Sequence, residues 1–361
     1  MEELLKLRLQ NQGLGSKPYG SLSETMSNLL ALQAQDYGQV KWVVGSRLPN
    51  CSEQTVDDLV NSGKLVRTWF MRGTYQLVRA EDVRWLMMVT SPRVNVIIKS
   101  RLLQFGLDDV LINKCRNIFT KVLDENKHLS REELVAILLQ KGISMSGLPL
   151  LHLLQKLSID GVICASRKLG GDFEFTRYDD WIPKTDVTEY DEALQRLSRA
   201  YFTTRGPATL ADFQWWSGLT QAECKKALQL ISKELSEMKI NETSYWFREP
   251  EHIQAAKQPS RIKMLGGFDE YLIAYRDRTA MLAQEFNHKV ITKNGLFSPI
   301  ILCDGKVIGT WKRVVKPKLV EVSCGFFNPK DLEKKELILK NLALYQQFMQ
   351  REMTVTFSDQ P

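Results

Sequence analysis

The chain has 361 residues, of which 43% are hydrophobic and 25% are charged. These proportions are those of an ordinary globular protein with room for two or three domains, and they exclude a disordered chain. The formal net charge of +7 and the isoelectric point near 9.0 favour partners that are polyanions.

The first residues do not have the pattern of a targeting signal. Glu2 and Glu3 stand where a secretory signal needs basic residues, and no apolar run approaches the ~18 residues that a membrane-spanning helix requires. We therefore expect a cytoplasmic protein that does not associate with membranes.

The cysteines and histidines predict neither disulfides nor a metal centre. The six cysteines form no C-x-x-C pair, and the four histidines lie in separate segments without H-x-x-x-H spacing. We predict no metal and no cofactor; the alternative is a metal site assembled from distant positions.

Residues 1–106 have the element order of a winged helix with flanking helices. Three amphipathic helices are followed by two alternating runs around Met71-Arg72-Gly73, which predict a β-hairpin. After the hairpin we expect one helix before Pro92 and a separate segment after it. The expected elements are helices at 1–15, 23–32, 37–48 and 52–63, and strands at 65–70 and 74–78.

Two glutamines, Gln33 and Gln35, lie between the first two of these three helices. In a helix their side chains would point about 200° apart, whereas in a strand they share one face and Ala34 turns inward. The segment between those helices of a winged helix is a short strand that pairs with the hairpin. We therefore predict a strand that presents both amides together, with a smaller supporting role for Asp36.

Two further cycles of helices and a hairpin predict a tandem array. The second occupies residues 107–185, with a capping box at Ser130-Arg131-Glu132-Glu133 and a hairpin turn at Gly170-Gly171. The third occupies residues 186–258. Their expected helices are at 109–123, 130–140, 147–159, 189–203, 209–216 and 220–232, and their strands at 161–166, 172–176, 235–240 and 245–247.

In residues 259–361 the sequence pattern changes from mainly helical to strand-like alternation, which predicts a β-rich region with a terminal helix. Strands are expected at 261–267, 289–292, 298–303, 306–311, 319–326 and 353–357, and the helix at 331–350. The predicted fold class is thus α+β, with tandem winged-helix (helix-turn-helix) modules and a β-rich C-terminal region.

Basic residues are concentrated in two stretches. Residues 61–101 carry eight basic residues against two acidic ones, and residues 306–318 carry five basic residues, with aromatic residues interleaved in both. Such surfaces contact phosphate and sugar, and the alternative is a solvated basic face. The predicted phosphate contacts are Lys64, Arg67, Arg72, Lys312 and Arg313.

With these motifs in view, the chain resembles the AlkZ/YcaQ superfamily of winged-helix DNA glycosylases. Gln33-Ala34-Gln35 matches the Gln, apolar, Gln signature of the AlkZ-like branch rather than the Gln-x-Asp of the YcaQ-like branch. Further blocks that resemble the family begin at Arg67, Gly206, Gly266 and Asp304, so the likeness is nearly full length. One departure is Gln76, where family members often have histidine.

The resemblance implies excision of N-alkylated purines from double-stranded DNA, including bulky adducts and interstrand crosslinks, by a monofunctional glycosylase without metal. It implies a monomer that works near the nucleoid. In this reading Gln33 and Gln35 are catalytic and hold the attacking water, because an amide carbonyl accepts hydrogen bonds although it takes no proton near neutral pH.

Two other functions remain open at this stage. Winged helices are common in transcriptional regulators, which would bind one DNA sequence without chemistry, usually as dimers. Three non-identical modules and the absence of an evident effector domain argue against a regulator. A nucleic-acid-binding scaffold without chemistry is the third reading.

Overall fold

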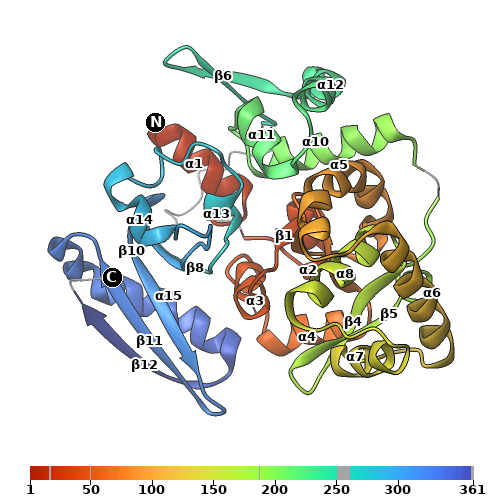
Figure 1. Cartoon of the computed structure of the whole chain (residues 1–361). Helices are drawn as coiled ribbons and strands as arrows, with labels where there is room; N and C mark the ends of the chain where they lie inside the picture. Colours follow the sequence, from red (N-terminus) through yellow and green to blue (C-terminus); the bar gives the residue numbers. More distant parts are fainter. Residues whose placement is uncertain (16–17, 49, 187, 250–260, 359–361) are drawn as a thin grey trace. The chain divides into compact units, whose positions relative to one another are not determined.

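The computed structural model describes residues 1–15, 18–48, 50–186, 188–249 and 261–358, and it is a mixed α/β protein (Figure 1). Packing divides the chain into two compact units. Unit 1 consists of Met1–Val56, Gln195–Trp216 and Gln221–Pro361, and unit 2 consists of Asp57–Leu194 and Ser217–Thr220. The predicted α+β class is confirmed, while the division into three winged-helix modules stays a prediction.

A five-stranded sheet forms the C-terminal part of unit 1, in the order β12-β11-β10-β9-β8. Neighbouring strands are antiparallel except β11 and β12, which run parallel because η4 (Pro329–Lys334) and α15 (Lys335–Met349) connect them and return the chain. The strands are β8 (Ile262–Leu265), β9 (Ile300–Cys303), β10 (Lys306–Val315), β11 (Leu319–Phe326) and β12 (Glu352–Ser358).

An aromatic cluster joins this sheet to the N-terminal helices of unit 1. Trp42 of α3 (Tyr37–Gly45) packs edge-on against Tyr345 of α15, and its indole donates to the carbonyl of Met264 at 2.8 Å. Trp311 of β10 packs against the same tyrosine and donates to the carbonyl of Leu265. Both indole N–H groups are satisfied, so the cluster is buried without losing hydrogen bonds.

The remaining elements of unit 1 largely follow the sequence prediction. The expected strand at 289–292 is wrong, because α14 (Asn287–Val290) occupies its first half and Ile291 forms only an isolated bridge with Phe297. The boundary between the units falls within α4 (Glu53–Asn61) and within α10 (Tyr190–Thr204). The other elements include α1 (Glu2–Asn11), α2 (Leu22–Leu29), β1 (Ala31–Gln33), α11 (Leu210–Ser217), α12 (Gln221–Ile231), β6 (Ser236–Ile240), β7 (Thr243–Phe247), α13 (Glu270–Ile273) and η4 (Pro329–Lys334).

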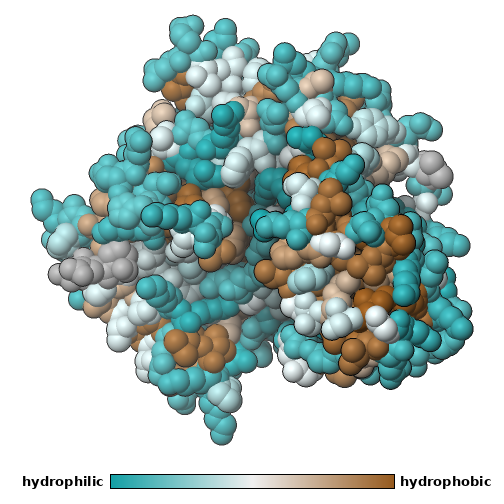
Figure 2. All heavy atoms as spheres, in the orientation of Figure 1, coloured by the Kyte–Doolittle hydropathy of each residue, from teal (hydrophilic) through white to brown (hydrophobic). Residues whose placement is uncertain are grey.

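Unit 2 contains an apolar core supplied by helices and two hairpins. Buried residues from Trp69 to Phe175 form one cluster, and the expected capping box opens α7. Much of the face in Figure 2 is hydrophilic, with hydrophobic residues exposed over several helices of this unit. The elements are β2 (Leu65–Phe70), β3 (Thr74–Arg79), α5 (Val83–Gln104), α6 (Asp109–Glu125), α7 (Arg131–Gln140), α8 (Gly147–Ile159), β4 (Ile163–Leu169), β5 (Asp172–Arg177) and α9 (Tyr178–Trp181).

The expected break at Pro92 is wrong. Proline removes one backbone hydrogen bond and crowds the preceding turn, which usually ends or kinks a helix. Helix α5 nevertheless continues through Pro92, with Val89 buried before it and Val94 and Ile98 buried after it. Packing on both sides of the proline outweighs the local cost.

All six cysteines are buried free thiols. Burial raises the pKa of Cys51 to about 11 and that of Cys324 to about 12, so both are protonated at neutral pH. Among the described residues, no helix is both long and apolar enough to cross a membrane.

Candidate active site

The two glutamines lie where β1 turns into α3. Strand β1 ends at Gln33, so the expected strand through Gln35 is wrong. The chain bends at Gln35 and Asp36 because Asp36 is the N-cap of the next helix. Gln33 is 7% exposed, Ala34 is fully buried as expected, and Gln35 is exposed. Their joint catalytic role stays a prediction.

The end of the preceding helix differs from the prediction. Helix α2 begins at Leu22 with Ser21 as its cap and ends at Leu29, three residues before the expected end. Leu30 follows with φ 60° and ψ −65°, a conformation that non-glycine residues seldom adopt. This turn converts the helix into the strand that carries Gln33.

Asp36 has a structural role that the sequence did not show. Its Oδ1 accepts a hydrogen bond from the backbone N–H of Gln39 at 3.0 Å, which caps α3. The side-chain Oε1 of Gln39 accepts from the backbone N–H of Gly267 at 3.1 Å. The first turn of α3 is therefore fixed both to the bend and to the loop that precedes α13.

We expect Asp36→Asn to keep base release within about threefold of the wild type, because asparagine caps helices as well as aspartate. Asp36→Ala should lower the free energy of unfolding by about 1 kcal/mol through loss of the cap. Single-turnover kinetics and urea unfolding measure the two effects. A loss of more than tenfold in the asparagine variant would instead give the carboxylate a direct part in the reaction.

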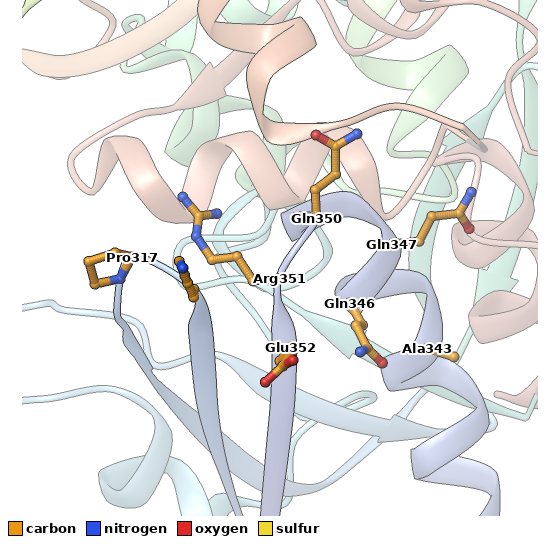
Figure 3. Close-up of a pocket in the computed structure, with 8 residues that line it drawn as sticks. Pro317, Ala343, Gln346, Gln347, Gln350, Arg351 and Glu352 are labelled. Atoms are coloured by element: carbon orange, nitrogen blue, oxygen red, sulfur yellow. The ribbon is translucent and has the colours of Figure 1, made fainter.

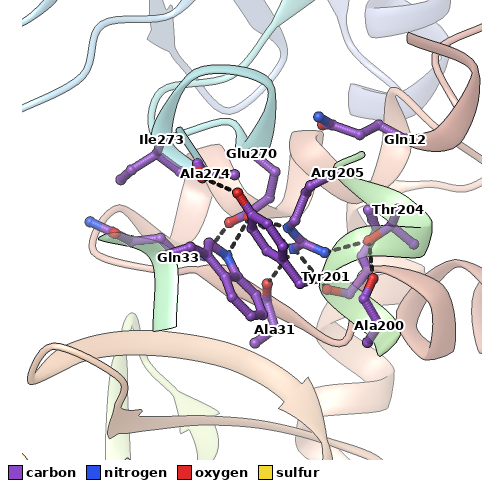
Figure 4. A network of polar contacts seen from close by, with 12 residues as sticks. Gln12, Ala31, Gln33, Ala200, Tyr201, Thr204, Arg205, Glu270, Ile273 and Ala274 are labelled. Atoms are coloured by element: carbon purple, nitrogen blue, oxygen red, sulfur yellow. Dashed lines mark hydrogen bonds and ion pairs between the residues drawn. The ribbon is translucent and has the colours of Figure 1, made fainter. Parts of the chain in front are cut away.

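A buried ion pair contacts β1 (Figure 4). Arg205, at the end of α10, donates from Nε and Nη2 to Oε2 of Glu270 at 3.0 and 2.8 Å. The same Nη2 lies 2.8 Å from the carbonyl oxygen of Leu29 and 3.1 Å from that of Ala31. Both charged side chains are at most 2% exposed. In Figure 4 the amide of Gln33 points away from this pair.

The carboxylate of Glu270 accepts hydrogen bonds from several further donors. Its Oε2 also accepts from the indole N–H of Trp216 at 2.9 Å, and its Oε1 accepts from the backbone N–H of Gln33 at 3.4 Å. The guanidinium of Arg205 lies 4.5 Å from the ring centre of Trp216 and donates to the hydroxyl of Thr204. A buried charge with this many partners is satisfied rather than strained.

A second buried ion pair uses the residue next to Glu270. Asp269 accepts two hydrogen bonds from Arg47, at 2.7 and 2.9 Å, and both side chains are at most 1% exposed. Burial alone would lower the pKa of Arg47, but Asp269, together with Tyr19 and Glu270, outweighs burial and the pKa is raised. Arg278 lies elsewhere in the unit, with its guanidinium over the rings of Trp215 and Phe297.

Arg313 and Lys312 lie on β10 of the same unit as the glutamines. Lys312 is exposed, whereas Arg313 is half-buried and donates to the hydroxyl of Tyr345. A side chain added at Gly38 would approach Arg313 Nη2 to 2.6 Å and Asp36 Oδ1 to 3.4 Å. The structure therefore brings Arg313 to the first turn of α3, beside the glutamine segment.

The other predicted phosphate contacts belong to unit 2. Lys64 is exposed just before β2, and Arg72 is half-buried with φ 54° at the tip of the β2–β3 hairpin. Arg67 stacks on the ring of Tyr75, with 3.5 Å between its guanidinium carbon and the ring centre, and lies 5.1 Å from that of Phe173. Arg67 thus has a packing role within the hairpin; phosphate contact stays a prediction for all three.

Gln76, the departure from the family pattern, is buried in β3. Its amide donates to the hydroxyl of Thr74 at 2.8 Å. The described residues contain no group of three or more His, Cys, Asp and Glu side chains that could hold a metal ion.

An open pocket of about 730 Å³ lies at the C-terminal end of α15 (Figure 3). It is rich in amides, from Gln346, Gln347 and Gln350, but it contains neither predicted catalytic glutamine. Its Arg351 already donates to Glu53 at 2.8 Å. The candidate site therefore lies at Gln33 and Gln35 rather than in this pocket.

The comparisons with known proteins cover the glutamine segment and most of the rest of the chain. The family model described as "DNA glycosylase AlkZ-like" matches residues 26–329, which include both glutamines and both buried ion pairs. The chain belongs to the AlkZ-like DNA glycosylase family. Its substrate as a member of this family is DNA.

Two further comparisons support this membership over nearly the whole chain. A curated protein of Streptomyces sahachiroi named interstrand DNA cross-link repair glycosylase is 28% identical over 334 residues, which is 87% of each chain. The solved structure of Streptomyces sahachiroi DNA glycosylase AlkZ matches with a TM-score of 0.81 at 25% identity and covers 99% of both chains. The AlkZ-like fold therefore extends through the β-rich C-terminal region.

The sequence prediction missed Arg47, Arg205 and Glu270. The sequence held one weak indication of two of them. Glu270 lies in the family-like block that begins at Gly266, and Arg205 directly precedes the block that begins at Gly206. Their partners are 65 and 222 residues away along the chain, so spacing could not pair them.

Proposed function

We propose that this AlkZ-like glycosylase hydrolyses the N-glycosidic bond of N-alkylated purines in duplex DNA and leaves the sugar–phosphate backbone intact. The observation that carries the proposal is the placement of Gln33. Its backbone is held by a buried ion pair, and its amide points away from that pair (Figure 4). Gln35 follows at an exposed bend, and Arg313 lies near Gly38 and Asp36 of the same segment.

The chemistry of the lesion suits side chains that carry no charge. A purine alkylated at N3 or N7 is already cationic, so the glycosidic electron pair leaves with the base and neutralises it. The sugar becomes oxocarbenium-like at C1′. Water then forms the new bond to C1′, and its proton is lost to solvent.

Two amide carbonyls are suited to the second half of this reaction. Glutamine is not a base near neutral pH, but its carbonyl oxygen accepts a hydrogen bond from water and stabilises nearby positive charge. Holding the water beside C1′ supplies proximity as well. We therefore assign Gln33 and Gln35 to positioning the nucleophile, in a monofunctional mechanism without a covalent enzyme intermediate.

Interstrand crosslinks are the second part of the proposed substrate range. The relative from Streptomyces sahachiroi is named for cross-link repair, and a crosslink formed through purine N7 carries the same cationic leaving group twice. We propose that the present chain releases both simple alkylpurines and crosslinked purines.

The test is release of the base from a duplex with one 7-methylguanine. The expected result is free alkylpurine, an intact strand before alkali, and strand cleavage only after hot alkali. Cleavage before alkali would contradict the monofunctional mechanism. Tight binding to one undamaged sequence without base release would favour a regulator. A duplex crosslinked through N7 should separate into single strands on denaturing gels after treatment.

A further inference from the structure

We infer that Arg205 is a positioning residue for Gln33: through Glu270 and two backbone carbonyls it fixes the strand that aims the catalytic amide. This inference rests on the proposed role of Gln33. Arg205 itself is fully buried, so we assign it no direct contact with the substrate.

One nitrogen of Arg205 holds both sides of the turn that starts β1. Its Nη2 donates to the carbonyl oxygens of Leu29 and Ala31, the residues on either side of Leu30. Leu30 has φ 60° and ψ −65°, close to a strained γ-turn. Such a conformation persists only where the surrounding structure over-determines it. Arg205 Nη2, the donor that the two carbonyls share, holds Leu30 in this conformation.

Glu270 extends the constraint to the end of the strand. Its Oε2 accepts from Arg205 and its Oε1 accepts from the backbone N–H of Gln33. The ion pair therefore contacts β1 at its first residue, Ala31, and at its last, Gln33. Rotation of the strand about its axis would break one contact or the other, so the direction of the Gln33 side chain is coupled to the pair.

The geometry requires the guanidinium of arginine and not merely a positive charge. The planar guanidinium donates in fixed directions, here to Glu270 from Nε and Nη2, to Thr204 from Nη1 and to two carbonyls from Nη2. An ammonium has three donors on a flexible stem and cannot reproduce this fork. Arg205→Lys therefore keeps the charge while loosening the strand.

The adjacent ion pair provides a matched control. Arg47 is equally buried and binds Asp269, the neighbour of Glu270, but its bonds go to Gln12, Val43, Ser46 and Asp269 and not to β1. Arg47→Lys should therefore disturb folding to a similar degree without redirecting Gln33.

The experiment measures single-turnover base release at saturating DNA, together with duplex affinity and thermal unfolding. We expect Arg205→Lys to slow release about 10- to 100-fold, the cost of misplacing a reacting group by a fraction of an ångström to 1 Å. Affinity should stay within about threefold in both variants, and release by Arg47→Lys should also stay within about threefold, as expected of a change remote from the site.

A double-variant cycle shows whether the effect passes through Gln33. In a Gln33→Ala background, Arg205→Lys should slow release no further, because coupled residues are non-additive. An additive loss in that background, or equal losses in Arg205→Lys and Arg47→Lys, would overturn the inference while leaving the glycosylase proposal intact. Full activity of Gln33→Ala would overturn the proposed role of Gln33 and this inference with it.

If Arg205→Lys does not fold, a more conservative pair of variants tests the inference. Thr204→Val removes the oxygen that accepts from Arg205 Nη1. Thr90→Val removes a comparable buried hydroxyl, which donates to the carbonyl four residues earlier as that of Thr204 does. We expect slower release in Thr204→Val and not in Thr90→Val. Equal rates in the two would overturn the inference.

Discussion

Gln33→Ala and Gln35→Ala should each slow single-turnover release of 7-methylguanine by about 100- to 1000-fold, the loss typical when one preorganised hydrogen-bonding group is removed from a transition state. The reason is that the attacking water would lose one of the two carbonyls proposed to hold it. The measurement is release of the base from a 7-methylguanine duplex at enzyme concentrations well above the dissociation constant.

Affinity separates this effect from loss of binding. Because the proposed amides act on the water and the developing charge, duplex affinity should stay within about threefold. Gln346→Ala is the matched control, since it removes an exposed glutamine of the same unit from the open pocket in Figure 3. Wild-type rates in both catalytic variants would remove Gln33 and Gln35 from the mechanism.

Asp269→Ala should lower the free energy of unfolding by about 3–5 kcal/mol, because it leaves the Arg47 guanidinium buried without its counter-charge. The remaining partners of Arg47, the carbonyls of Gln12 and Val43 and the side chains of Gln12 and Ser46, do not neutralise it. Urea unfolding measures the change, and the variant should also precipitate at lower temperature.

An exposed ion pair in the same unit provides the comparison. Arg261 and Asp304 are paired with side chains 65% and 50% exposed. Asp304→Asn should change stability by less than about 1 kcal/mol, since exposed pairs contribute little and asparagine tolerates the positive φ of this turn. Similar losses of unfolding free energy in Asp269→Ala and Asp304→Asn would show that burial does not increase the contribution of the Arg47–Asp269 pair to stability.

Local patterns were sufficient to predict most elements of this fold. The β2–β3 hairpin, α8 and β11 have nearly the bounds that alternation, helical periodicity and turn residues predicted. The helix at 23–32 and the break at Pro92 were wrong because tertiary contacts decide them. Arg205 holds the carbonyls around Leu30, and packing on both sides carries α5 past the proline.

The candidate site was predicted only in part. Sequence motifs identified Gln33 and Gln35, but not that the first is almost buried and the second exposed. The difference arises because β1 ends at Gln33 so that Asp36 can cap α3. The buried arginines that hold this region pair with acids far along the chain, and no local pattern encodes such pairing.

The spacing of the Arg47–Asp269 pair has a consequence for synthesis on the ribosome. The core of unit 2 lies within one continuous stretch, from Trp69 to Phe175, and can form as soon as that stretch emerges. Arg47 emerges earlier, yet its carboxylate partner is 222 residues downstream, roughly 10–45 s later at 5–20 residues per second. The segment bearing the glutamines is therefore synthesised long before its packing partners, and unit 1 completes its folding last.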